Sequence, residues 1–213
     1  MFIVQYAILI GLAAAGSAAP LLTFAHLWQV KEWRLDRLRE HLRAEGFFRQ
    51  LFGVVRPTAT LPFLLLVLGT RLESQALTII LLGVFAAIAG IQMALRKQPT
   101  PVWTTKARVL VAAAALLTIG IASLAAVRGN PAVLPAVVLL QPAVLMLAWS
   151  IFLPVDTILK RRIFRRAMHL RASLRDVTVI GITGSAGKTT TKELLAHVLE
   201  QRSPLTTPAH VNT

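Results

Sequence analysis

Cysteine is absent from this sequence, and acidic residues are scarce. The lack of cysteine excludes disulfide bonds and metal sites built on thiolates. The five histidines have no spacing typical of metal ligands. Only 9 Asp and Glu oppose 23 Lys and Arg, which gives a formal net charge of +14. Such an excess suits nucleic acid or a membrane surface. We favour the membrane because the basic residues cluster at the ends of apolar runs.

Charge is also missing from long stretches of the chain. Hydrophobic residues make up 55% of the 213, and the mean hydropathy of +0.66 is typical of a membrane protein. About 20 apolar residues in a helix cross a bilayer core about 30 Å thick. We therefore predict five membrane spans, at residues 2–28, 51–70, 76–95, 109–127 and 132–153. The second span is the weakest, because Pro62 lies within it. The fifth contains Pro135 and Pro142.

The first apolar run has no positive charge ahead of it. A cleaved signal peptide begins with a positively charged segment, whereas no Lys or Arg precedes Lys31. The small residues at 13–19 resemble a processing site, so cleavage is the alternative. We favour an uncleaved helix, with His26 and Gln29 at its membrane boundary.

No ionisable side chain lies in the core of the third, fourth or fifth span. Buried charges usually mark an ion or proton pathway, so a transporter has little support. Gln141 is the main polar residue there. We predict that it forms hydrogen bonds between helices rather than binding a substrate. The membrane region is then an anchor, or a scaffold for a membrane partner.

The basic residues are unevenly divided between the two sides of the predicted spans. Segments 31–56, 96–108 and 160–175 hold eighteen Lys and Arg, whereas the intervening turns hold only Arg71 and Arg128. The positive-inside rule places the three basic segments in the cytoplasm and the N-terminus outside. The protein is therefore expected to be a multi-pass protein of the cytoplasmic (inner) membrane, with everything after residue 155 in the cytoplasm.

Two of the basic segments have an apolar helical stripe. Segment 31–50 suits either an anionic lipid surface or a solvated helical loop with internal ion pairs. Segment 156–175 suits either anionic headgroups or the stop-transfer charge that follows a last span. Nucleic-acid binding ranks third for this segment, because no groove-reading or stacking motif accompanies the charge.

Residues 176–192 carry the one motif whose spacing implies chemistry, DVTVIGITGSAGKTTTK. The β-branched residues from 177 to 182 predict a short buried strand, and residues 192–200 predict a helix. Strand, glycine loop, lysine with hydroxyl, and helix are the parts of a phosphate-binding loop. The first glycine of the strict pattern is missing, because Ile182 stands there. A glycine-rich turn without a ligand is the alternative.

The motif assigns a role to each loop residue. Lys188 reaches the terminal phosphates and is the expected catalytic residue, and the Thr189 hydroxyl is the expected ligand of Mg²⁺. Glycines let backbone N–H groups approach a polyphosphate closely. The residues expected to bind ATP are Gly184, Ser185, Ala186, Gly187, Lys188, Thr189 and Thr190.

Residues 181–200 resemble the opening of the ATP-binding domain of Mur ligases, whose loop also has the form TGxxGKTT. Residues 207–213 are similar to a TxxNxNN stretch in the branch that adds D-alanyl-D-alanine to a UDP-N-acetylmuramoyl peptide. Thr207 and Asn212 match this stretch, whereas His210 and Thr213 replace two of its asparagines. The resemblance covers about 38 of the 213 residues.

The resemblance implies an ATP- and Mg²⁺-dependent ligase that joins a carboxylate to an amine in peptidoglycan or related cell-envelope synthesis. A UDP-muramyl-peptide-like or lipid-linked molecule would be the substrate, and Asn212 would lie near the nucleotide or this substrate. Mur ligases usually have a soluble domain before the loop, where this chain has a membrane region. A membrane-tethered kinase acting on a lipid-linked sugar is the second hypothesis, and a non-catalytic scaffold is the third.

The expected architecture is a multi-spanning α-helical membrane domain followed by the first strand, loop and helix of an α/β phosphate-loop domain. The membrane domain is expected at 1–155, a basic linker at 156–175 and the start of the ATP-binding domain at 176–213. One strand and one helix cannot bury a core, so we expect the chain to be the front part of a longer protein, inactive alone.

The charge asymmetry makes a direct prediction about topology. A reporter enzyme fused after Arg128 should be active outside the cytoplasmic membrane, and a fluorescent reporter fused after Lys106 should fluoresce in the cytoplasm. Both fusions are compared in the same cells by activity and fluorescence. The reverse pattern would overturn the predicted orientation.

Overall fold

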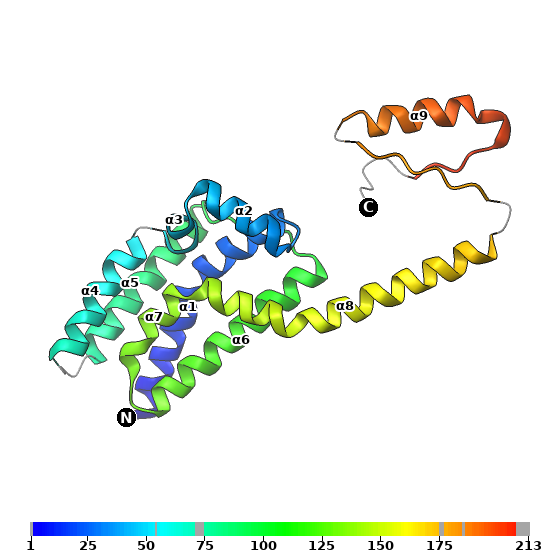
Figure 1. Ribbon diagram of the computed structural model, residues 1–213. Coiled ribbons are helices and arrows are strands. Elements are labelled where there is room, and N and C mark those ends of the chain that lie inside the picture. Colours follow the sequence, from blue (N-terminus) through cyan, green and yellow to red (C-terminus); the bar gives the residue numbers. More distant parts are fainter. Residues whose placement is uncertain (1, 54, 71–74, 175–176, 185, 208–213) are drawn as a thin grey trace. The chain divides into compact units, whose positions relative to one another are not determined.

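A computed structural model of the chain describes residues 2–53, 55–70, 75–174, 177–184 and 186–207 (Figure 1). The chain divides into two units, Met1–Leu159 and Lys160–Thr213. The first unit is a helical bundle. The second contains the end of one long helix, the glycine-rich loop and one further helix.

Four helices of the described chain are long and apolar enough to cross a membrane. They are α1 (Phe2–Val30), α5 (Gln75–Ala94), α6 (Thr105–Val127) and α8 (Gln141–Ser173). The first, third and fourth predicted spans are therefore confirmed as helices, with ends within four residues of those expected. The protein is a helical membrane protein by these lengths and compositions.

The second predicted span is divided. α3 (Phe47–Phe52) ends at Gly53, and α4 (Val55–Thr70) follows. α4 has 16 residues, about 24 Å of helix, which is shorter than a bilayer core of about 30 Å. Gly53 has φ +68°, a conformation that glycine adopts without strain, so the chain turns there between the two helices.

The fifth predicted span, residues 132–153, is not one helix, although its part from Gln141 onward lies in a helix long enough to cross a membrane. The segment begins with a 3-10 turn, η1 (Pro131–Val133), and continues as α7 (Leu134–Leu139). The chain breaks at Leu140, and α8 then runs for 33 residues to Ser173. Pro142 explains the break because its ring removes an N–H and clashes with the carbonyl four residues earlier. Pro142 fits the first turn of α8, where N–H groups have no helical partner.

Segment 95–104 lies along the last turns of α1 and fixes the direction of the helices. The Gln98 side chain donates to the Ala19 carbonyl at 2.9 Å and to the Thr23 hydroxyl at 2.8 Å. Gln29 and Val102 exchange two hydrogen bonds, of 2.8 and 2.7 Å. α1 therefore ends where α6 begins, and we call this end of the bundle the basic end. α1 and α5 both start at the other end of the bundle (Figure 1). The segment from α2 to α4 therefore connects the end of α1, at the basic end, to the start of α5 at the opposite end.

His26 contributes to the same contact. Its Nδ1 lies 3.0 Å from the Thr100 carbonyl oxygen. His26 and Gln29 thus anchor segment 95–104. Both lie near the end of α1, and their position at a membrane boundary stays a prediction.

A buried amide joins three helices in the middle of the bundle. Gln141, at the start of α8, is 0% exposed. Its Nε2 donates to the Ser17 hydroxyl of α1 at 3.1 Å and to the Val137 carbonyl of α7 at 3.0 Å. The Thr118 hydroxyl of α6 lies 3.2 Å from the amide oxygen. The predicted role of Gln141 between helices is confirmed.

Two apolar clusters complete the bundle. One gathers Leu9, Ala13, Leu82, Phe85, Ala122, Leu134 and Val138. Next to it, Gly16 lets α1 approach α5 closely, because a Cβ at that position would lie 3.1 Å from the Phe85 Cβ. The other cluster, at the basic end, is built around Trp28, which packs on Trp33 and Trp149 with ring centroids 5.8 and 5.2 Å away.

α2 (Leu35–Glu45) adds its apolar stripe to this second cluster. Leu38 and Leu42 are buried there, so the stripe packs on the bundle itself. Neither alternative considered for segment 31–50, a lipid surface or a solvated loop, included this packing. The opposite face of α2 is charged, as expected for an amphipathic helix.

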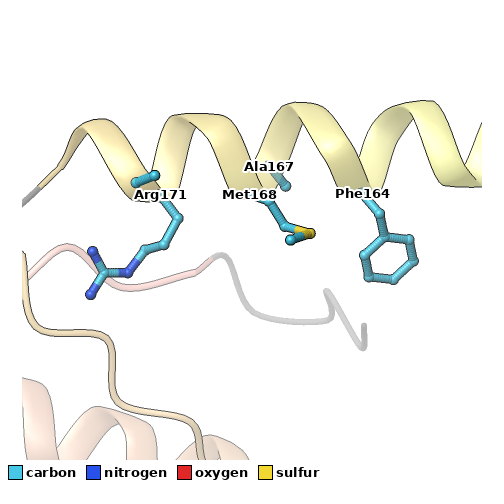
Figure 2. A pocket seen from close by; sticks show the side chains of 5 residues that line it. Phe164, Ala167, Met168 and Arg171 are labelled. Atoms are coloured by element: carbon cyan, nitrogen blue, oxygen red, sulfur yellow. The ribbon is translucent and has the colours of Figure 1, made fainter.

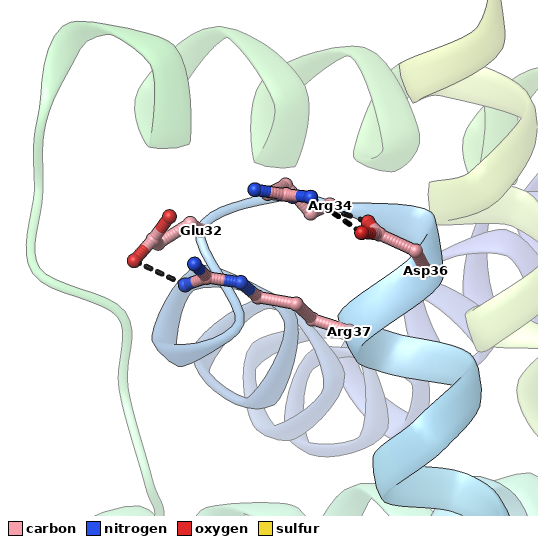
Figure 3. A network of polar contacts seen from close by, with 4 residues as sticks. All are labelled: Glu32, Arg34, Asp36 and Arg37. Atoms are coloured by element: carbon pink, nitrogen blue, oxygen red, sulfur yellow. Dashed lines mark hydrogen bonds and ion pairs between the residues drawn. The ribbon is translucent and has the colours of Figure 1, made fainter. Parts of the chain in front are cut away.

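Two ion pairs lie at the turn into α2 (Figure 3). Arg34 binds Asp36, and Arg37 binds Glu32. The hydrogen bond from Arg34 lowers the pKa of Asp36 from its ordinary value of 3.8 to about 2. This pair therefore stabilises the fold above pH 3.8, and the contribution disappears as the pH falls through 2. Both side chains are exposed, so the effect is small.

Replacing Gln141 tests the buried amide. Gln141→Leu keeps an apolar side chain of similar length but leaves the Ser17 hydroxyl without this partner. We expect the free energy of unfolding in detergent to fall by about 1 kcal/mol, the usual size of a hydrogen bond between membrane helices. Gln92→Leu on α5 is the control. Equal unfolding curves for the two variants would contradict the role of Gln141.

Candidate phosphate-binding site

The glycine-rich loop adopts backbone conformations that favour glycine at two positions. Gly184 has φ +155° and Gly187 has φ +76°. A side chain at either position would strain the backbone, whatever space surrounds it. The sequence therefore places glycine at the positions where the loop requires it, and the second of them directly precedes a helix.

That helix, α9 (Lys188–Val198), begins at the lysine of the motif. It starts four residues earlier than the expected 192 and ends two residues before 200. Its N-cap is the left-handed Gly187, and no side chain of the described residues caps the start. The first backbone N–H groups of α9 thus keep their hydrogen-bonding capacity and the partial positive charge of a helix start.

Lys188 points back over the loop. Its Nζ donates a hydrogen bond to the Gly184 carbonyl oxygen. Its side chain is half-buried, whereas Thr189 and Thr190 are exposed. The ammonium group of Lys188 and the uncapped start of α9 therefore lie on one short loop, and this is the arrangement that a phosphate-binding loop requires.

Thr191, in the first turn of α9, bonds back to the residue before the helix. Thr191 donates from both its backbone N–H and its hydroxyl to the Gly187 carbonyl, each at 2.9 Å. The hydroxyl of Thr191 is therefore engaged, whereas the side chains of Thr189 and Thr190 at the start of α9 are exposed. Thr189, next to Lys188, is the residue suited to a metal ion bound with phosphate.

Two of the predicted site residues, Ser185 and Asn212, lie outside the described part of the chain. The other loop residues are Gly184, Ala186, Gly187, Lys188, Thr189 and Thr190, and the structure brings them together in one turn. Among the described residues, no group of three or more His, Asp or Glu is placed to hold a metal ion. Binding of ATP phosphates and Mg²⁺ by these residues therefore stays a prediction.

The strand expected at 177–182 is not formed. These residues have irregular structure, and no strand occurs anywhere in the described residues. A strand needs a neighbouring strand for its backbone hydrogen bonds, and no such neighbour is described. The apolar side chains of Val179 and Ile180 are exposed as a result. The phosphate-loop domain therefore stays a prediction.

A lysine that the sequence did not single out ties the loop helix to the following segment. The Lys192 Nζ, one turn after Lys188, donates to the Thr207 carbonyl at 2.7 Å. Thr207 is the first residue of the stretch that resembles a substrate-binding sequence. No spacing rule identifies such a contact, because its acceptor is a backbone oxygen 15 residues away.

The rest of the second unit is the exposed end of α8. Lys160, Arg161, Arg162, Arg165, Arg166 and Arg171 lie on it, with apolar residues between them. Phe164, Met168 and Arg171 project from one side of the helix and line a hollow of about 570 Å³ with Ala167 and Ala172 (Figure 2). The helical stripe predicted for segment 156–175 is thus present, although it continues the span rather than forming a separate linker.

Comparison with protein-family models, with curated proteins and with solved structures finds no match to this chain.

The Lys192 contact leads to a measurable prediction. Lys192→Met removes the bond to Thr207 and should loosen residues 205–207, whose backbone order parameters fall toward about 0.6 in NMR relaxation. Arg202→Met, which removes a positive charge from the same unit, is the control and should leave them unchanged. Equal order parameters in wild type and Lys192→Met would contradict the anchoring role.

Proposed function

We propose that the chain is the front part of a membrane-anchored, ATP-dependent ligase that joins a carboxylate to an amine, of the kind that Mur ligases represent. The observation that carries the proposal is the TGSAGKTT loop, with a left-handed Gly187 directly before the uncapped start of α9. The substrate would be a cell-envelope precursor, either UDP-muramyl-peptide-like or lipid-linked.

Each loop residue has a part in this chemistry. Backbone N–H groups from Gly184 to Thr190, Ser185 and Ala186 included, bind the phosphates of ATP, and Lys188 offsets negative charge on the transferred phosphoryl group. Thr189 supplies a hydroxyl to Mg²⁺. The ion held there would supply positive charge beside the phosphates. Asn212 lies in the stretch proposed to contact the nucleotide or the carboxylate substrate.

The reaction class follows from the resemblance rather than from the loop alone. The substrate carboxylate attacks the terminal phosphate of ATP, which gives an acyl phosphate and ADP. The amine then attacks the acyl carbon, phosphate leaves, and an amide forms. A phosphate loop by itself serves equally in a kinase, where the acceptor keeps the phosphoryl group. The requirement for an amine separates the two reactions.

The membrane region holds the loop near the cytoplasmic surface in this proposal. Lys31 and the basic residues of α2, segment 96–108 and the end of α8 all favour the cytoplasmic side. The N-terminus is then outside the inner membrane. Anionic headgroups are the proposed neighbours of the exposed basic end of α8, which carries no acidic residue from 160 to 173.

Nucleotide binding tests the site directly. We expect a longer protein that carries this sequence, purified in detergent, to bind a fluorescent ATP analogue in the presence of Mg²⁺, and Lys188→Ala to weaken this binding by about tenfold or more. The reason is that a charged hydrogen bond contributes about 1.5–3 kcal/mol. Lys97→Ala, an exposed lysine outside the loop, is the control. Equal affinities for wild type and Lys188→Ala would sink the phosphate-loop assignment.

A second measurement separates the reaction classes. A longer protein that carries this sequence should release ADP and phosphate only when a carboxylate acceptor and an amine are both supplied. Phosphate transfer to a single acceptor without amine would indicate a kinase instead. If neither reaction occurs and the protein still inserts in the membrane, the result would indicate a non-catalytic scaffold.

A further inference from the structure

An apolar groove lies between α6 and α8, within the membrane-spanning part of the first unit. Its volume is about 490 Å³. Leu116, Leu117, Ile121 and Leu124 line it from α6, and Ala148 and Ile151 line it from α8. Leu116 and Ile151 are among the most exposed side chains of these helices, at 70% and 63%. No polar or charged side chain lines the groove, so it suits a hydrocarbon and not a water-soluble ligand.

Buried and small residues border the groove. Leu110 and Ala114 of α6 and Leu145 of α8 are fully buried in the apolar cluster at the basic end. Toward the surface, the lining includes Ala113 and Gly120, which are seven residues, or about 10 Å, apart on α6. A Cβ added at Gly120 would meet no atom within 4 Å. The small residues thus leave space that no part of the described chain fills.

The groove points toward the basic end of the bundle. α6 starts there, and Lys106 lies seven residues before Ala113, so the two share one face of the helix. The Lys106 Nζ is 3.2 Å from an Asp156 carboxylate oxygen of α8, and the two side chains are 25% and 18% exposed. This ion pair joins the two helices beyond the end of the groove.

Positive charge dominates this end. Segment 96–108, which leads into α6, contains Arg96, Lys97, Lys106 and Arg108 and no acidic residue. Asp156 offsets only one of these charges. A ligand with a hydrocarbon chain in the groove would therefore have its head near an excess of cations, which favours an anionic head.

We propose that this groove binds the chain of an isoprenoid phosphate, with its phosphate at the Lys106 end. Two features favour this lipid. The groove has room for one chain, and the open space beside the small residues Ala113 and Gly120 suits methyl branches better than a straight acyl chain. The inference rests on the proposed function, because a lipid-linked precursor is one of the two substrate classes proposed there. The membrane domain then holds the substrate, in addition to anchoring the protein.

Photolabelling tests the groove in the intact chain. The protein is placed in phosphatidylcholine nanodiscs with a photoreactive polyprenyl phosphate, and the labelled peptides are mapped by mass spectrometry. We expect label in residues 113–124 and 148–151. Gly120→Leu fills the free space without a clash and should lower labelling there by about tenfold, since each displaced methylene is worth about 0.8 kcal/mol.

Gly90→Leu is the matched control. Gly90 is an exposed glycine on α5 with no atom within 4 Å of an added Cβ, and it does not line the groove. Labelling should be unchanged in this variant. Equal labelling of Gly120→Leu and Gly90→Leu, or label spread evenly over all four long helices, would overturn the proposal.

Competition identifies the lipid. Unlabelled polyprenyl phosphate should displace the probe, whereas phosphatidic acid and neutral polyprenol should require at least about tenfold more. Equal displacement by phosphatidic acid would reduce the site to a general acyl-chain groove and overturn the isoprenoid assignment. A wild-type dimer that Gly120→Leu converts to a monomer would show that a second copy occupies the groove.

The outcomes also separate this inference from the proposed function. Specific labelling without ATP binding would support the lipid site and contradict the proposal of a phosphate-loop enzyme. ATP binding that depends on Lys188, without labelling of the groove, would retain the enzyme and overturn the lipid site. The two measurements use residues on different units of the chain.

Discussion

The bundle depends on one buried amide. In a bilayer there is no water to satisfy a polar group, so the Gln141 side chain must find all its partners within the protein. It finds them on three segments: the Ser17 hydroxyl of α1, the Thr118 hydroxyl of α6 and the Val137 carbonyl of α7. These bonds set the start of α8 beside α1 and α6. The Trp28–Trp149 contact and the Lys106–Asp156 pair then hold the same helices together at the basic end.

Hydropathy was sufficient to predict the membrane helices because their chemistry is local. The runs at 2–28, 76–95 and 109–127 each became one helix, and Gln141 acted between helices as expected. Proline was harder to interpret. Pro20, Pro62 and Pro154 lie inside helices, whereas a break occurs just before Pro142. Membrane helices tolerate proline inside them, so the presence of a proline in an apolar run does not by itself tell where a helix breaks.

The site was predictable in its local part only. Gly184 and Gly187 have the backbone angles that glycine permits, and α9 begins at Lys188, next to the loop. The strand failed, because a strand is defined by a partner at a distance in the sequence. The Lys192–Thr207 bond and the packing of α2 on the tryptophan cluster were missed for the same reason. Both join residues whose proximity follows from the fold and not from spacing.

The polar contacts along α1 give this helix a structural role beyond anchoring the chain in the membrane. Ala19, Thr23, His26 and Gln29 occupy successive turns and hold segment 95–104 by polar bonds. A generic anchor of equal hydropathy would insert in the membrane equally well, yet it would present the wrong atoms to that segment. One inserted residue would rotate the lower turns by about 100° relative to the upper ones. The first helix is therefore not interchangeable with another apolar helix. Chimaeras that replace it would lose the bonds that position segment 95–104 ahead of α6.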